Sequence, residues 1–149
     1  MNLELTKAML ERHEGSRNIP YQDSKGIWTV GVGHNMSGPL SAYVITRIFE
    51  EDMTVVIDEL TDNFQWFSGL NDARQGALID LAFNMGLPTL LKFKKTLRYL
   101  SAGEYEDAAE ELLIGSAPGD ISWYYHDVGS RAEEISRMIR TGEWSDGIS

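Results

Sequence analysis

The sequence predicts a mostly helical α+β fold with one N-terminal helix, a small β-hairpin and then five or six further helices. Apolar residues recur at helical spacing along most of the 149 residues, and glycines stand where these patterns stop. One short segment, residues 19–33, instead has two β-prone runs around a turn. The length suits one compact domain that buries about two-thirds of the surface its unfolded chain exposes.

The first element is a helix that begins near Leu3, because apolar residues follow at helical spacing up to His13. Gly15 is well placed to end it. Two β-prone runs, 19–23 and 27–33, then flank the turn-like triplet Ser24-Lys25-Gly26, which predicts a hairpin. The glycines at the end of the second run allow another group to approach the backbone closely.

Helical spacing returns after residue 38, where Ser41 is a candidate cap for a helix that runs to about Asp62. A helix of about 22 residues is about 33 Å long, which is enough to join two lobes. Asn71 is expected to open another helix, which Gly86 can close. This helix is apolar nearly all round, so it should lie at the centre of the larger lobe.

The C-terminal half is expected to hold shorter helices, two of which should end at Gly103 and Gly115. The run Ser130-Arg131-Ala132-Glu133 has the pattern of a capping box and predicts the start of the last helix, with Gly142 at its end. No internal repeat, linker or low-complexity segment interrupts this order.

Charge and composition narrow the functional classes. With 13 basic and 23 acidic residues the net charge is −10, which argues against nucleic acid as a partner. The chain has no cysteine, so it can form neither a disulfide nor a thiolate metal site. His13 and His126 have no metal-ligand spacing, and we expect neither a metal nor a cofactor. No apolar run approaches the about 20 residues of a membrane span, and no signal-peptide pattern opens the chain.

Three polar residues around the hairpin are candidates for catalysis. Glu14 ends the first helix, Asp23 follows nine residues later at the end of the first strand, and Thr29 lies six residues beyond on the second strand. The hairpin can bring Asp23 and Thr29 together, with Glu14 across the gap. Glycosidic bond cleavage uses one carboxylic acid and one carboxylate, and a hydroxyl can position water. The alternatives are a solvated helix end for Glu14 and a turn-forming role for Asp23, since 23 acidic residues make such a spacing common by chance.

These residues are part of a longer pattern: Glu14-Gly15, Tyr21-x-Asp23 and Gly26-x-Trp28-Thr29-x-Gly31-x-Gly33-His34. The pattern closely resembles the active-site signature of the phage-type lysozymes, glycoside hydrolase family 24. The spacing of Glu14, Asp23 and Thr29 matches that family's catalytic triad without insertion. Looser matches extend the resemblance over essentially the whole chain: Phe49 with Asp52, Phe83-x-Met85-Gly86, Ser130-Arg131-Ala132 and Arg140-Thr141-Gly142-x-Trp144.

The resemblance implies a lysozyme-like fold of two lobes. A small β lobe would span about residues 15–40, and a helical lobe about residues 63–149 together with the N-terminal helix, joined by the long helix. It also implies hydrolysis of the β-1,4 bond between N-acetylmuramic acid and N-acetylglucosamine in bacterial peptidoglycan. Glu14 would be the general acid, Asp23 the base or charge stabiliser, and Thr29 the group that positions water. The family is generally regarded as inverting.

Further roles follow from the same resemblance. Arg131 matches an arginine near the catalytic glutamate, His34 and Asp52 match an ion pair between the hairpin lobe and the long helix, and Tyr21 belongs to the signature as a supporting residue. Four positions match substrate contacts: Asn35, Phe83, Thr96 and Glu111. Core packing is the alternative for Phe83, and Glu111 replaces the amide expected at its position.

Two other functions stay open. A lytic transglycosylase acts on the same polymer with one glutamate and without water, whereas the presence of both Asp23 and Thr29 favours hydrolysis. A non-catalytic wall-binding or virion module with the same fold is the second alternative.

The expected setting is the host bacterial cytoplasm before release to the wall, with a membrane-pore protein (a holin) as partner, or carriage in the virion. A monomer without membrane insertion is expected. The acidic net charge should slow approach to an anionic wall at low ionic strength. A cluster of cations is a candidate basic patch or simply a solvated helix face: Lys92, Lys94, Lys95 and Arg98.

Overall fold

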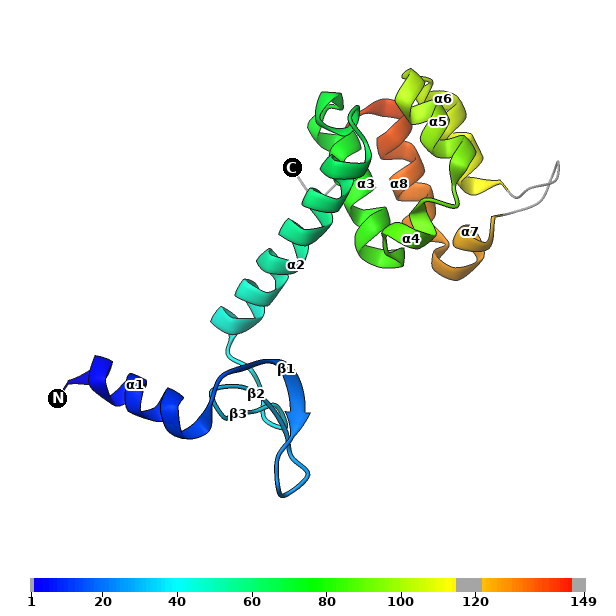
Figure 1. The fold of residues 1–149 in the computed structure, drawn as a ribbon. Coiled ribbons are helices and arrows are strands. Elements are labelled where there is room, and N and C mark those ends of the chain that lie inside the picture. Colours follow the sequence, from blue (N-terminus) through cyan, green and yellow to red (C-terminus); the bar gives the residue numbers. More distant parts are fainter. Residues whose placement is uncertain (1, 115–121, 146–149) are drawn as a thin grey trace. The chain divides into compact units, whose positions relative to one another are not determined.

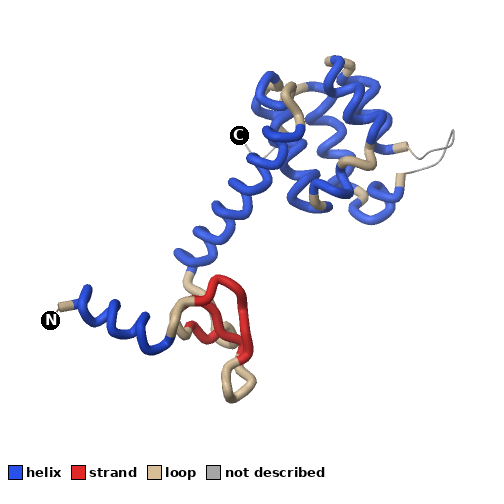
Figure 2. The backbone as a smooth tube through the Cα atoms, viewed as in Figure 1, coloured by secondary structure: helices blue, strands red, loops and turns tan. Residues whose placement is uncertain are grey.

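The computed structural model describes residues 2–114 and 122–145 and confirms the mostly helical α+β class. The chain divides into two compact units, Met1–Ile48 and Phe49–Ser149. All strands of the described residues belong to the first unit, and the second is built from helices (Figures 1 and 2).

The first unit contains a helix and a small sheet. Helix α1 (Leu3–Glu14) is capped at its start by the Asn2 side chain and ends at Gly15, as predicted. The strands β1 (Arg17–Gln22), β2 (Trp28–Gly31) and β3 (His34–Asn35) form an antiparallel sheet in the order β1-β2-β3. The hairpin is therefore confirmed. Strand β3 was not predicted, because two residues are too few to show an alternating pattern in the sequence.

Helix α2 (Ala42–Asn63) begins where Ser41 predicted it, and the Ser41 hydroxyl accepts a hydrogen bond from the Val44 amide at 3.3 Å. It crosses the division between the two units. Its C-terminal part contributes Leu60 to the core of the second unit.

Helix α3 lies in the core of the second unit, where its Ala77, Leu78 and Leu81 are completely buried. This confirms the central position that its apolar character predicted. Helix α8 packs on α3 and on α6, and α6 also packs on α5 (Figure 1). The elements in chain order are η1 (Phe67–Gly69), α3 (Asp72–Met85), α4 (Leu87–Leu90), α5 (Lys94–Ala102), α6 (Tyr105–Leu113), α7 (Trp123–Val128) and α8 (Ser130–Thr141).

Most predicted helix ends are confirmed. The Asn71 side chain caps α3 and Gly86 ends it, while Gly103 ends α5 in the left-handed conformation with φ 75°. The end predicted at Gly115 lies outside the described residues. Gly142 ends α8 with φ 73°.

The predicted capping box at Ser130 is wrong. The residue before α8 is Gly129, with φ 45° and ψ −107°, and no side chain caps the helix. Helix α7 ends only one residue earlier, so a single glycine must turn the chain and Ser130 already lies inside α8. Glu133 instead accepts a hydrogen bond from the Tyr125 hydroxyl at 2.5 Å.

Candidate active site

Glu14 is the last residue of α1, directly before the chain turns at Gly15 with φ 71°. Its carboxylate lies over the backbone of Gly33: a methyl group built on Gly33 would be 3.5 Å from Glu14 Oε2. Gly33 itself has φ 71°, a conformation that favours glycine. The close approach expected at the glycines therefore occurs here, where the Glu14 side chain lies beside Gly33.

Asp23 organises the turn between β1 and β2. Its Oδ1 atom accepts hydrogen bonds from the amides of Lys25 at 2.8 Å and Ile27 at 2.9 Å. Its own amide donates to the Ile27 carbonyl, and its carbonyl accepts from the Gly26 amide, each at 3.0 Å. These four bonds fix the orientation of the carboxylate relative to the turn.

Thr29 lies on the central strand of the sheet and is only 5% exposed. Its hydroxyl donates to the Ile27 carbonyl at 3.0 Å. A hydroxyl has one proton to donate, so Oγ1 keeps only acceptor capacity for other partners. The backbone of Ile27 thus binds both Asp23 and Thr29. Sequence reasoning could not identify Ile27, because a backbone role requires no particular side chain.

The neighbours of Thr29 in the sheet include two more predicted residues. Tyr21 is its register partner on β1, and Asn35 is its partner on β3. The Tyr21 ring has the Arg17 guanidinium 4.3 Å from its centre, and the Asn35 side chain accepts from the Ser37 amide at 2.8 Å. His34 is exposed next to Asn35. The first unit therefore contains the three triad candidates, and its sheet pairs Thr29 with Tyr21 and Asn35.

The second unit holds the remaining predicted residues. Asp52 is exposed on α2. Phe83 is 42% exposed and makes an edge-on contact with Phe49, with 5.8 Å between ring centres, so it is not a core residue. Thr96 is in contrast 2% exposed and lies within the core, and its hydroxyl has no hydrogen-bond partner among the described residues. Glu111 forms an ion pair with Lys95 at 3.4 Å.

Arg131 makes a two-pronged ion pair with Asp80 of α3, with Nε to Oδ1 at 2.8 Å and Nη2 to Oδ2 at 3.0 Å. Hydrogen bonding to Asp80 raises the pKa of Arg131. Burial, with a further contribution from the Asp80 charge, raises the pKa of the nearby Tyr124 to about 12. Sequence reasoning missed Asp80, although an acidic residue in a nearly all-apolar helix signals a buried or paired role.

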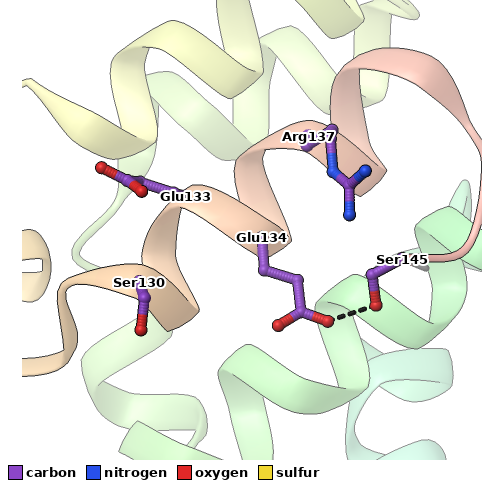
Figure 3. A pocket seen from close by; sticks show the side chains of 5 residues that line it. All are labelled: Ser130, Glu133, Glu134, Arg137 and Ser145. Atoms are coloured by element: carbon purple, nitrogen blue, oxygen red, sulfur yellow. Dashed lines mark hydrogen bonds between the residues drawn. The ribbon is translucent and has the colours of Figure 1, made fainter. Parts of the chain in front are cut away.

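A separate polar hollow of about 410 Å³ lies on α8 (Figure 3). Its lining residues are Ser130, Glu133, Glu134, Arg137 and Ser145. Glu134 accepts a hydrogen bond from Ser145, and Glu133 is bonded to Tyr125. None of the predicted site residues lines this hollow.

The described residues form neither a metal-binding cluster nor a membrane-spanning helix. Among them no group of three or more histidine, aspartate and glutamate side chains is arranged to hold a metal ion. No helix in residues 2–114 and 122–145 has both the length and the apolar character needed to cross a membrane.

Comparison with known families settles the classification. The phage lysozyme family matches residues 11–119, a span that contains Glu14, Asp23 and Thr29. The chain belongs to this family. Membership indicates a glycosidase-type enzyme with lysozyme-type activity.

Individual relatives agree with this family. The chain is 32% identical over 119 residues to the endolysin of Salmonella phage P22, covering 74% of this chain and 80% of that protein. It is 24% identical to a probable T4-type lysozyme 1 of Dictyostelium discoideum, covering 91% and 94%. It is also 27% identical to the pre-baseplate central spike protein Gp5 of Enterobacteria phage T4, covering 90% of this lysozyme chain and 27% of that longer protein.

Proposed function

We propose that this lysozyme hydrolyses the β-1,4 bond between N-acetylmuramic acid and N-acetylglucosamine in peptidoglycan, with Glu14 as general acid, Asp23 as base or charge stabiliser and Thr29 as the group that positions water. The observation that carries the proposal is the shared anchor of Asp23 and Thr29 on the backbone of Ile27. This anchor lies within the span that matches the family.

The hydrogen bonds around Ile27 suggest how a water would be oriented. Because Thr29 donates its only hydroxyl proton to the Ile27 carbonyl, a water beside Oγ1 must donate to it. Asp23 uses Oδ1 for two backbone amides, and Oδ2 has no protein donor in the described part of the chain. A water that donates to both Oδ2 and Oγ1 would direct a lone pair at the sugar carbon, and Asp23 would take up its proton.

Glu14 would supply the other half of the reaction by protonating the oxygen of the leaving sugar. Its carboxyl group lies beside Gly33, in the same compact unit as Asp23 and Thr29. An inverting outcome requires about 6.5–9.5 Å between the two carboxyl groups, which leaves room for the water. From the family resemblance alone we expect the first sugar product to have the inverted anomeric configuration, which proton NMR during digestion would detect.

The decisive experiment digests purified peptidoglycan with the wild-type protein and the Glu14→Gln variant, and identifies the fragments by mass spectrometry. Glu11→Gln is a matched control, because it makes the same change one helical turn earlier on α1. Reducing-end fragments from the wild type and from the control, but not from Glu14→Gln, would support the proposal. Fragments lighter by one water would identify a transglycosylase, and no fragments at all would leave a wall-binding or virion module.

The roles of Asp23 and Thr29 have their own matched variants. Asp23→Asn keeps an oxygen that can accept from the two turn amides but removes the charge. We expect it to abolish turnover while the protein stays folded. Thr29→Val should reduce turnover strongly and Thr29→Ser much less, because serine keeps the hydroxyl. Equal activity of both Thr29 variants would rule out the hydroxyl as the water-positioning group.

The supporting roles of Arg131, His34 and Asp52 remain predictions, as do the substrate contacts. Peptidoglycan is the proposed partner of the enzyme, with a monomer as the expected form. The endolysin relatives favour release from the cytoplasm to the wall through a membrane pore. The spike-protein relative favours carriage in the virion instead, and assaying purified particles for the protein would separate the two settings.

A further inference from the structure

The charge of this lysozyme is unevenly distributed along the chain. Residues 81–103 contain four cations, Lys92, Lys94, Lys95 and Arg98, and no acidic residue. The rest of the chain therefore has 13 − 4 = 9 basic residues against all 23 acidic ones, a net charge of −14. The four cations, at the start of α5 and just before it, are called the α5 basic patch here.

All four cations of the patch are exposed. Lys95 is paired with Glu111 of the neighbouring helix α6, and the Arg98 guanidinium lies 5.0 Å from the centre of the Tyr99 ring. Lys92 and Lys94 have no ionic partner among the described residues. Glu106, another acid of α6, pairs with Arg140 of α8. The patch therefore keeps positive charge that the acidic surroundings do not neutralise.

The position of the patch is unfavourable for the helix that contains it. Cations at a helix N-terminus oppose the helix dipole, and the first turn of α5 has no acidic residue and no side-chain cap. Lys94 and Arg98 are four residues apart, so two like charges face each other on one side of the helix. A local arrangement that weakens its own helix is typical of residues that serve a function.

We propose that the α5 basic patch binds the carboxylates of the peptide stems of peptidoglycan and so docks the enzyme on its substrate; this rests on the proposed function. A protein of charge −10 is repelled by an anionic wall. At 0.1 M salt, screening weakens this repulsion mainly between charges more than about 10 Å apart. A local cationic surface reverses the sign of the interaction where contact is made. Lysine suits this partner, because a compact charge on a flexible stem can follow carboxylates on a mobile peptide.

The test compares binding of two double variants to purified wall sacculi, in a Glu14→Gln background so that the wall stays intact. Lys92→Gln with Lys94→Gln should weaken binding about three- to tenfold at low ionic strength, and the difference should vanish in concentrated salt. The control, Lys7→Gln with Arg12→Gln on α1, removes the same charge and should bind several-fold more tightly than the patch variant. Equal binding of the two double variants would overturn the inference.

Two treatments of the sacculi identify the ligand. Converting the stem carboxylates to amides should abolish the difference in binding between the patch variant and the control. Hydrofluoric acid, which removes phosphodiester polymers, should leave that difference unchanged. The opposite result would show that the patch binds phosphate polymers and would overturn the assignment to stems. Thermal melting checks folding: removing repelling charges from α5 should leave the melting temperature unchanged or higher.

Activity separates this inference from the proposed function. On glycan strands freed of their peptides, the patch variant with an intact Glu14 should be as active as the wild type, but on intact sacculi it should be slower. Equal slowing on both substrates would overturn the docking role. Patch-dependent binding by a wild-type protein that releases no fragments would overturn the proposed function and support the docking inference.

Discussion

Thr96 provides the sharpest test of the packing, because it combines burial with an unsatisfied polar group. Its side chain is 2% exposed in the core, and Oγ1 has no hydrogen-bond partner among the described residues. A buried hydroxyl without a partner costs about 1–3 kcal/mol relative to one that keeps its hydrogen bond to water. Thr96→Val replaces the hydroxyl with a methyl group of nearly the same shape and keeps the β-branch.

The expected gain in the free energy of unfolding is about 1–2 kcal/mol, because threonine and valine have similar helix propensities and the packing volume is almost unchanged. For a chain of about 150 residues, each 1 kcal/mol shifts the melting temperature by about 2–4 °C. Thr96→Val should therefore melt about 2–8 °C above the wild type. Thr96→Ser keeps the hydroxyl and loses the methyl group, and should cost about 0.5–1.5 kcal/mol through the cavity it leaves.

Thermal and urea unfolding of the three proteins, followed by circular dichroism, would measure both changes. A valine variant that is no more stable than the wild type would refute the reasoning. The same proteins also test the resemblance, which gives Thr96 a substrate contact. If the hydroxyl is kept for the substrate, Thr96→Val should gain stability and lose activity on peptidoglycan, whereas Thr96→Ser should keep activity despite its lower stability.

Three further changes test separate parts of the structure. Gly33→Ala should cost about 1–2 kcal/mol, because an alanine is strained at φ 71°, and should lower lysis through the new methyl group beside Glu14; unfolding and turbidity assays would measure both. Gly76→Ala should destabilise the folded protein by about 1–3 kcal/mol although alanine has the better helix propensity, because the added carbon would overlap the Trp144 ring. A rise in melting temperature would contradict this packing. Burial favours the neutral form of Tyr124 and raises its pKa to about 12. The contribution of this shift to the free energy of unfolding is therefore complete below pH 10 and is lost as the pH rises to about 12. Ultraviolet titration should show one tyrosine that ionises late.

The local structure could be predicted because its signals are short-range. Asn71, Gly86 and Gly103 mark helix ends through their own backbone preferences or side-chain hydrogen bonds, and these act within a few residues. The prediction of a capping box at Ser130 failed because a neighbouring element, and not the local pattern, set the start of the helix. The pattern was present, but the end of α7 one residue before Gly129 decided where α8 began.

The partners of individual side chains could not be predicted in the same way. The ion pair between Arg131 and Asp80 joins residues 51 positions apart, and nothing near either residue specifies the other. The resemblance gave Arg131 a role beside Glu14, a different carboxylate. Arg131 donates to Asp80 through Nε and Nη2. Its Nη1 still has two protons to donate, and an arginine can bind a second carboxylate from that side. The role of Arg131 beside Glu14 stays a prediction.

Asp23 shows why a catalytic and a structural interpretation of one residue need not compete. The sequence left open whether Asp23 was a turn-forming residue or a catalytic carboxylate, and the hydrogen bonds to Lys25 and Ile27 establish the turn. These bonds occupy one oxygen and orient the other. The Ile27 carbonyl also accepts a hydrogen bond from the Thr29 hydroxyl, so both side chains are bonded to the same backbone residue. The proposed catalytic pair would need such preorganisation, and an asparagine could keep the hydrogen bonds to the turn while losing the charge.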